Sequence, residues 1–348
     1  MRPLRQISSL LFCALAVLWV TSGVHAETKA PRVGEFLGAK KTEYPAWFKE
    51  SFLEFADDVR EAARAGKRIM VMFHQDGCPY CNALVEHNLS QKDIEQQVRD
   101  HFDVVAVNMW GDRDVVSVDG QTYSEKNFAS ALKVQFTPTL MFFDENGGVV
   151  LRIDGYLPPQ KFKLALDYVA GRKESEMTYR EYLALHARPA GAGTLRTESF
   201  FAPPPYDFSG DASGQPLAVF FEQTQCPNCE TLHEHVLKDS ETQAVIERFR
   251  SVQLDMWSDT PVVTPAGEHT TAGAWAKALD VKYAPTIVLF DRGTEVIRSE
   301  ASFKIFHTQS IFDYVASGAY QKEPSFQRYI SARAEHIREQ GRDVDIWR

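Results

Sequence analysis

One stretch of the chain reads Ile69-Met70-Val71-Met72-Phe73-His74-Gln75-Asp76-Gly77-Cys78-Pro79-Tyr80-Cys81. An apolar, β-prone run leads into two cysteines and then into a helix-like pattern, so both thiols are expected where a strand passes into a helix. Unsatisfied N–H groups at a helix start favour an anion, and a thiolate there has a lowered pKa. Side chains three residues apart on a helix have Cβ atoms about 5–6 Å apart, which suits a disulfide. The stretch therefore predicts a reactive pair in which Cys78 is the nucleophile and Cys81 the resolving thiol.

The same pattern returns in the second half of the chain, which contains Phe221-Glu222-Gln223-Thr224-Gln225-Cys226-Pro227-Asn228-Cys229. Other segments recur in the same order, with only small slips in spacing. The matched segments are Met109-Trp110-Gly111-Asp112 with Met256-Trp257-Ser258-Asp259, Thr137-Pro138-Thr139 with Ala284-Pro285-Thr286, and Asp167-Tyr168-Val169-Ala170 with Asp313-Tyr314-Val315-Ala316. A repeat of about one domain in length indicates a tandem duplication rather than a solenoid.

The N-terminus has the pattern of a secretory signal. Arg2 and Arg5 precede an apolar run over residues 10–20, and a small-residue cleavage site ends at Ala26. The run is shorter than the roughly 20 residues that span a bilayer, which argues against a membrane anchor. Cys13 lies inside the run behind a bulky residue, which argues against a lipoprotein. We therefore expect residues 1–26 to be a signal peptide and the mature chain to be periplasmic.

Loss of the signal changes both the charge and the cysteine count. It removes two arginines and no acidic residue, so the formal net charge of −9 becomes −11. Such acidity argues against nucleic acid or anionic lipid as a partner, and no insertion of the mature chain into a membrane is expected. The cysteines that remain all belong to the two close pairs. An exported protein with only such pairs does not use disulfides as a framework, so they are expected to serve chemistry.

Composition and the repeat divide the remainder of the chain. Residues 27–43 are polar with scattered Pro and Gly and are expected to form a tether. The first domain covers residues 44–187 and the second covers residues 216–348. Residues 188–215 are rich in Pro, Gly and Ser and are expected to form a linker. This linker should be packed in part, because its aromatic residues Phe200, Phe201 and Tyr206 are costly to expose.

Apolar spacing places the secondary structure of the first domain. A 3–4 spacing predicts an amphipathic entry helix over residues 47–63, and a polar loop is expected over residues 112–120. The remaining predicted strands cover residues 69–73, 104–109, 140–143 and 149–153, and the remaining predicted helices cover residues 91–100, 125–132, 160–170 and 177–187.

This order of elements resembles the thioredoxin fold in both halves, which together cover most of the chain after the signal. Within that fold, the chain resembles exported SoxW-like and related bacterial thioredoxins. The segments that carry this resemblance are Trp47-Phe48-Lys49-Glu50-Ser51-Phe52, Cys78-Pro79-Tyr80-Cys81, Phe136-Thr137-Pro138-Thr139 and residues 320–329. The resemblance implies an α/β fold with two tandem domains, each a central mixed β-sheet flanked by helices.

The resemblance also implies a substrate-binding element opposite each cysteine pair. Pro138 and Pro285 would be cis-prolines, exposing backbone groups that pair with an extended substrate chain. The preceding residue touches the thiols in the family, and it is Thr137 in one half and Ala284 in the other. Thr at this place resembles the isomerases and reductases, whereas Ala284 lacks a hydroxyl. The two sites are therefore expected to differ in reduction potential.

The sequence departs from the thioredoxin pattern in one respect. Thioredoxins carry a buried Asp six residues before the nucleophilic cysteine, and here those positions are Met72 and Phe220. Glu222 and His74, each four residues before a nucleophilic cysteine, are the nearest titratable candidates. Proton transfer at the resolving cysteine is therefore expected to differ from that of thioredoxin.

Other interpretations of these residues remain open. A structural disulfide is disfavoured, because so short a loop constrains the unfolded chain little. The recurring His87 and His235 suggest zinc ligation as an alternative. On a continuous helix, however, His87 would lie about 9 Å beyond Cys81 on another face. We expect no metal or organic cofactor. Trp110 and Trp257 are expected either to pack at the rim or to form a substrate wall.

These features predict a thiol–disulfide oxidoreductase in which Cys78 and Cys81, and likewise Cys226 and Cys229, exchange disulfides. The expected substrates are protein or small-molecule disulfides, and electrons would come from a dithiol redox partner, a membrane reductant being one candidate. A reductase or electron relay is the main expectation. A disulfide isomerase or oxidase is an alternative, as is one catalytic domain beside a non-catalytic partner-binding domain.

Overall fold

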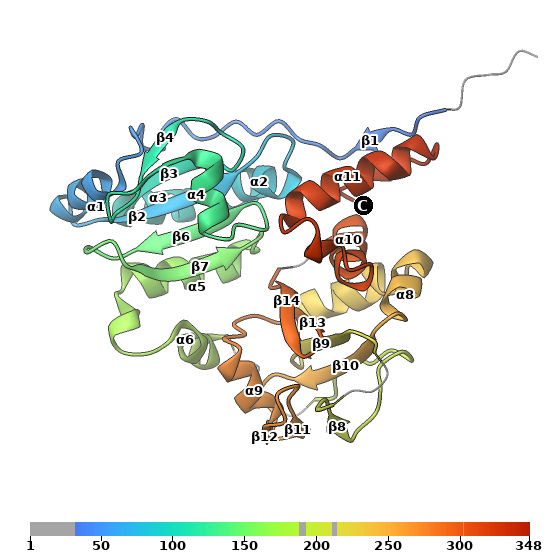
Figure 1. Ribbon diagram of the computed structural model, residues 1–348. Coiled ribbons are helices and arrows are strands. Elements are labelled where there is room, and N and C mark those ends of the chain that lie inside the picture. The colour runs from blue at the N-terminus through green and yellow to red at the C-terminus, as the bar shows by residue number, and fades with distance from the viewer. Residues whose placement is uncertain (1–31, 188–192, 211–213, 302) are drawn as a thin grey trace, which may run out of the picture. The chain divides into compact units, whose positions relative to one another are not determined.

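The computed structural model describes residues 32–187, 193–210, 214–301 and 303–348, and Val33–Arg348 form one compact unit. The first repeat contains a four-stranded mixed sheet in the order β3-β2-β6-β7 (Figure 1). Strand β2 (Arg68–His74) pairs parallel with β3 (Phe102–Asn108) and antiparallel with β6 (Thr139–Phe143). Strand β7 (Val149–Asp154) pairs antiparallel with β6. The predicted strands are thus confirmed to within about two residues.

The second repeat builds the same sheet from its own strands. Its order is β10-β9-β13-β14, with β9 (Leu217–Glu222) parallel to β10 (Arg250–Asp255) and antiparallel to β13 (Thr286–Asp291), which pairs with β14 (Thr294–Ser299). The expected α/β fold of two tandem domains with mixed sheets is confirmed.

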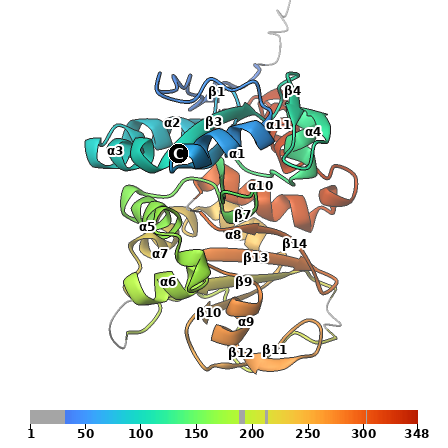
Figure 2. The same cartoon turned by 90° about the vertical axis from the view of Figure 1, so that its left-hand side faces the viewer.

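Helices cover both faces of each sheet, as Figure 1 and Figure 2 show. In the first repeat they are α1 (Phe55–Arg64), α2 (Pro79–Ala83), α3 (Lys92–His101), α4 (Glu125–Ala131), α5 (Pro159–Ala170) and α6 (Tyr179–His186). In the second they are α7 (Pro227–Thr231), α8 (Ser240–Ile246), α9 (Ala272–Ala278), α10 (Ile305–Ala316) and α11 (Phe326–Glu339). A π-helical turn follows α2 at Leu84–Leu89 and α7 at Leu232–Val236.

Strand β2 shows why the sheet needs helices on both sides. Its alternate residues Met70 and Met72 belong to the apolar cluster that includes α3 and α5, whereas Ile69, Val71 and Phe73 belong to the cluster that includes α1 and α4. Successive side chains of a strand point to opposite faces, so a continuously apolar strand must be covered twice. This burial fixes the position of the C-terminal end of β2, and the first cysteine pair comes shortly after that end in the chain.

The entry helix predicted over residues 47–63 is wrong in its first part. Helix α1 begins only at Phe55, and Leu53 has a φ of 62°, which belongs to the left-handed region and interrupts a right-handed helix. Phe52, predicted to lie on the apolar face, is 95% exposed. The 3–4 spacing of apolar residues continues across Leu53, so it could not reveal that the helix begins only after this residue.

Short strands occur in segments that were expected to be irregular. The segment predicted as a polar loop contains β4 (Asp114–Val116), which pairs with β5 (Thr122–Ser124). The segment predicted as a tether contains β1 (Phe36–Leu37), which pairs in parallel with β15 (Val344–Asp345). Residues 1–31, including the expected signal, and residues 188–192 and 211–213 of the expected linker lie outside the described residues.

The expected packing of the linker aromatics is confirmed. The Phe201 ring lies 4.9 Å from that of Phe220, and Phe200 packs on the same cluster. Tyr206 is part of β8 (Tyr206–Asp207), which pairs with β11 (Pro261–Val263), itself paired with β12 (His269–Thr271).

The two repeats share part of their core through their last helices. Tyr179 of α6 packs its ring 5.9 Å from Tyr283 of the second repeat, and Phe326 of α11 packs 5.4 Å from Phe136 of the first. Lys277 of α9 pairs with Glu181 of α6, and these helices are neighbours in Figure 1. The last helix of each repeat, α6 or α11, thus packs against the other repeat.

Candidate active site

Cys78 lies at the junction of β2 and α2, as predicted. It is the N-cap residue of α2, and its Sγ accepts a hydrogen bond of 3.0 Å from the backbone N–H of Cys81. The two cysteines form a disulfide with a Cα–Cα distance of 5.3 Å, and Pro79 occupies the first helical turn. A sulfur that accepts a backbone N–H is stabilised in its anionic form, because the donor is already in place.

The second pair has the same local geometry. Cys226 is the N-cap residue of α7 and its Sγ accepts a 3.1 Å hydrogen bond from the N–H of Cys229. Their disulfide has a Cα–Cα distance of 5.2 Å. The duplication therefore extends to the hydrogen bonds of the sulfur atoms.

Both predicted prolines are confirmed as cis and both face the cysteines. The Thr137–Pro138 and Ala284–Pro285 bonds are cis. The carbonyl oxygen of Thr137 lies 3.5 Å from Cys78 Sγ, and that of Ala284 lies 3.5 Å from Cys226 Sγ. The geometry thus brings together the cysteine pair and the two residues expected to bind substrate in each repeat.

A glutamine and a tryptophan flank each site, and the sequence reasoning did not identify the glutamine. Trp110 Nε1 donates to Gln75 Oε1 at 2.8 Å, and Gln75 Nε2 donates to Thr137 Oγ1 at 3.0 Å. In the second repeat Trp257 Nε1 donates to Gln223 Oε1 at 2.9 Å, but Ala284 has no hydroxyl to accept the next bond. Both glutamines precede their cysteine by three residues, a recurrence that was visible in the sequence.

The two titratable candidates lie in different surroundings. His74 is partly buried, its Nδ1 has no hydrogen-bond partner among the described residues, and burial lowers its pKa. Glu222 is 1% exposed, and His233 Nε2 lies 3.1 Å from each of its carboxylate oxygens. His233 also contacts Glu198 through Nδ1 at 2.8 Å. Burial acts to lower the pKa of His233, but hydrogen bonds and charges of Glu222 and Glu198 outweigh it and raise the pKa.

The first pair is covered by the second repeat. Cys78 is 3% exposed, and the cavity of about 260 Å³ beside it is lined on one side by α11 and by Ile346. Ile330 and Ala334 of α11 and Ile346 contribute apolar side chains to this cavity, and Gln327 accepts a 2.8 Å hydrogen bond from Gln75. Residues of α11 therefore border the approach to Cys78.

A second cavity, also of about 260 Å³, is bordered by both motifs. Tyr80 stands between Cys78 and Cys81, Asn228 stands between Cys226 and Cys229, and both line this cavity together with Pro285. The walls also include Phe303 and Trp347, so most of the lining is apolar. One residue of each Cys-x-x-Cys segment therefore lines this cavity, and the cysteines themselves are not among its lining residues.

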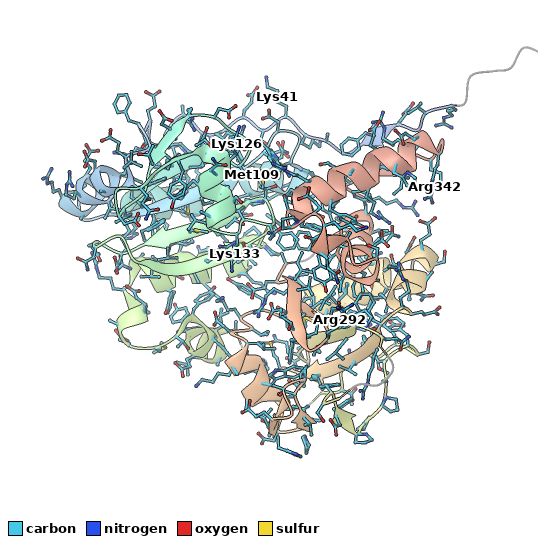
Figure 3. All side chains as sticks on the ribbon, in the orientation of Figure 1. Lys41, Met109, Lys126, Lys133, Arg292 and Arg342 are labelled. Carbon is cyan, nitrogen blue, oxygen red and sulfur yellow. A yellow bond between two sulfur atoms is a disulfide. The ribbon has the colours of Figure 1, made fainter. Side chains whose placement is uncertain are left out.

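A groove of about 500 Å³ runs beside Trp110 on the outside of the first site. Met109, Lys126 and Lys133 of the first repeat line it and are labelled in Figure 3. Arg328 of α11 lies on its other side, with Cζ 5.8 Å from the centre of the Trp110 ring. Trp110 is 37% exposed and its ring borders this groove.

The family comparison agrees with this geometry. The family model described as a thioredoxin-like domain matches residues 55–170 and again residues 211–309, which together are more than half of the chain. The chain belongs to the thioredoxin-like domain family. With a disulfide at the Cys-x-x-Cys of each repeat, this thioredoxin-like protein is a thiol–disulfide oxidoreductase.

Comparisons with individual proteins add the following likenesses. Curated protein sequences yield no match. Among solved structures, a thioredoxin-fold protein from Helicobacter pylori is 21% identical, covering 40% of this chain and 92% of its own, with a TM-score of 0.31. A thioredoxin from Thermus thermophilus is 22% identical, covering 39% and 87%, with a TM-score of 0.27. The C-terminal domain of DsbD from Neisseria meningitidis is 15% identical, covering 32% and 90%, with a TM-score of 0.25.

Two further properties concern only the described residues of this thioredoxin-like protein. In that part of the chain, no three His, Cys, Asp or Glu side chains are grouped so that they could hold a metal ion. Over the same ranges, no helix combines the length and apolar character needed to cross a membrane.

Proposed function

We propose that this thioredoxin-like protein is an exported reductase or electron relay that uses both cysteine pairs. The observation that carries the proposal is the cavity bordered by Tyr80 and Asn228, because it brings one residue from each Cys-x-x-Cys segment of the chain to a common space. A signal-like N-terminus and the SoxW-like segments support an exported role, with sulfur-compound oxidation or cytochrome maturation as its setting.

The proposed reaction at the first site proceeds by two thiolate displacements. The Cys78 thiolate attacks one sulfur of a substrate disulfide, forming a mixed disulfide and releasing the other substrate sulfur as a thiolate. The Cys81 thiolate then attacks Cys78 Sγ, which re-forms the Cys78–Cys81 bond and releases the second substrate sulfur. The substrate gains two electrons and two protons, and the enzyme dithiol loses them. A dithiol partner, for which a membrane reductant is one candidate, reverses the change.

Cys226 and Cys229 would react in the same order at the second site. Thr137, Pro138, Ala284 and Pro285 would position the substrate, because their backbone lies directly against the nucleophilic sulfur atoms. Trp110 and the groove beside it would contact the substrate chain next to the disulfide.

Two double variants, C78S/C81S and C226S/C229S, test this proposal in an insulin reduction assay. A relay requires both pairs, so each variant should lose turnover while its remaining pair still exchanges with glutathione. Unchanged turnover of C226S/C229S would overturn the relay and favour a partner-binding role for the second repeat. Efficient refolding of scrambled ribonuclease, together with slow reduction of insulin, would favour an isomerase instead.

Export is tested by the mature N-terminus. A chain recovered from the periplasm should begin at residue 27 if cleavage follows Ala26. An uncleaved chain that remains in the cytoplasm would contradict export.

A further inference from the structure

A lysine of the first repeat reaches into the second active site. Lys161 lies near the start of α5, and its Nζ donates a 2.9 Å hydrogen bond to the carbonyl oxygen of Ala284. The same oxygen lies 3.5 Å from Cys226 Sγ. The ammonium and the nucleophilic sulfur of the second site are therefore both neighbours of one atom, although they come from different repeats.

The surroundings of Lys161 strengthen the effect of its charge. Its Nζ lies 6.0 Å from the centre of the Tyr283 ring, and burial lowers the pKa of Lys161 to about 8. Since this value is above 7, the group remains mainly cationic at neutral pH. A desolvated charge acts on a neighbouring charge more strongly than one in water.

Among the residues that the structure describes, no acidic side chain forms an ion pair with Lys161, and burial alone shifts its pKa. Burial raises the pKa of Tyr283 and of Tyr179, which packs on it from α6, so both phenols are neutral. Glu300 of the adjoining segment is 6% exposed and pairs with Arg298 at 3.4 Å, and burial raises its pKa.

At the first site, a histidine takes the position that corresponds to Lys161. Lys161 and His307 occupy the same place in the two repeats, six residues before the matched Asp167 and Asp313. His307 Nδ1 lies 3.5 Å from the hydroxyl oxygen of Tyr80, so it too reaches the other repeat's cysteine motif. Burial lowers the pKa of His307 to about 4, however, and the imidazole is neutral at pH 7.

We propose that Lys161 is a positioning residue of the second site, where its ammonium stabilises the thiolate of Cys226. A stabilised thiolate favours the reduced pair, so Cys226–Cys229 is more oxidising than Cys78–Cys81. Electrons then pass from the first pair to the second, whose disulfide takes up two electrons and two protons as the first dithiol loses them. This inference rests on the proposed exchange chemistry and assigns it a direction.

The test uses the full-length chain with four single substitutions. Lys161→Met removes the charge and the hydrogen bond, Lys161→Gln keeps a donor without the charge, and Lys161→Arg keeps the charge. Lys163→Met is the matched control. Lys163 lies two residues further along α5, and its side chain is 40% exposed and pairs with Asp93. Thermal unfolding monitored by circular dichroism verifies that each variant is folded.

Two measurements are made on each variant. After reduction with a phosphine, the pH dependence of the Cys226 alkylation rate reports the pKa of that thiol. Equilibration with glutathione, followed by trapping and mass spectrometry, reports the midpoint of the Cys226–Cys229 pair. We expect K161M and K161Q to raise the Cys226 pKa by roughly 1 unit or more, as for loss of an opposite charge nearby. The glutathione equilibrium should shift roughly threefold to tenfold toward the disulfide, tenfold being about 30 mV.

The controls separate charge from structure. K161R should keep the Cys226 pKa near that of the wild-type chain, and K163M should leave it unchanged. An unchanged Cys226 pKa in both K161M and K161Q would overturn the role of Lys161. A wild-type pair that alkylates after phosphine treatment but never equilibrates with glutathione would instead overturn the proposed exchange function.

Discussion

At the residue scale, the two active sites differ in what surrounds two nearly identical disulfides. Thr137 offers a hydroxyl that accepts a hydrogen bond from Gln75, whereas Ala284 offers only its carbonyl, which accepts one from Lys161. The cysteines were predicted because their spacing and flanking pattern are visible in residue types, and the cis-prolines because the chain resembles the thioredoxins. It could not predict Lys161, because a lysine on an amphipathic helix has no local feature that identifies a partner 123 positions away.

The buried cluster around His233 gives a residue-scale prediction for pH. Because the folded pKa is raised, the contribution of His233 to stability is fully present below its unfolded pKa of about 6.5 and is lost as pH rises through the folded pKa. The stability advantage of the wild-type chain over His233→Gln should therefore fall by roughly 1–3 kcal/mol between about pH 6 and pH 9. Urea unfolding at a series of pH values measures this difference.

The control for this prediction is His87→Gln, because His87 is exposed on the π-helical turn of the first repeat. Its effect on the free energy of unfolding measures the loss of an exposed side chain, and the effect of His233→Gln is compared with it. A His233→Gln difference that does not vary with pH would show that the imidazole is not held in its protonated form.

At the element scale, the secondary structure of the cysteine-bearing segments followed directly from sequence. The apolar run predicted β2, and the helix after each cysteine pair was confirmed. Strands β1 and β15 were not predicted, because two-residue strands at opposite ends of the described chain carry no periodicity. The cover that these ends and α11 place over Cys78 could likewise be recognised only in the structure.

Helix α11 should control the access of reductants to the first site. Ile330→Ser removes an apolar contact over Cys78, and a local loss of about 1–2 kcal/mol would raise the open population about 5- to 30-fold. The rate of Cys78–Cys81 reduction by excess phosphine should rise accordingly, while that of Cys226–Cys229 stays constant. Quenched alkylation with mass spectrometry follows both pairs in one sample.

Leu183→Ser is the matched control, since Leu183 holds the corresponding buried position of α6 and does not line the cavity over Cys78. It should leave the Cys78–Cys81 reduction rate unchanged. Equal rates in the wild-type chain and Ile330→Ser would mean that α11 does not limit access.

At the scale of the whole molecule, the duplication was evident from the sequence, but the exchange of contacts between repeats was not. The repeated segments carry their register with them, which is enough to predict two similar domains. Which surfaces of two similar domains meet depends on side chains far apart in the chain. Arg180 is an example, because it donates to the carbonyl oxygens of Val281 and Met256 across the junction.

Arg180→Met should weaken the whole unit rather than one repeat. The buried guanidinium also lies 4.4 Å from the centre of the Trp257 ring, and its loss leaves buried carbonyl groups without this donor. We expect the free energy of unfolding to fall by about 2–4 kcal/mol, measured by urea denaturation. Arg328→Met, which removes an exposed guanidinium near Trp110, should change it by no more than about 0.5 kcal/mol. Similar effects of both substitutions would contradict a stabilising junction at Arg180.

The most direct measurement is a redox titration of the full-length chain in glutathione buffers, with each cysteine pair quantified separately by alkylation and mass spectrometry. Both pairs should titrate reversibly as two-electron couples, with midpoints between about −270 and −120 mV and with Cys226–Cys229 the more oxidising. Two pairs that remain disulfides at every potential would contradict the assignment of this chain as a thiol–disulfide oxidoreductase with two working sites.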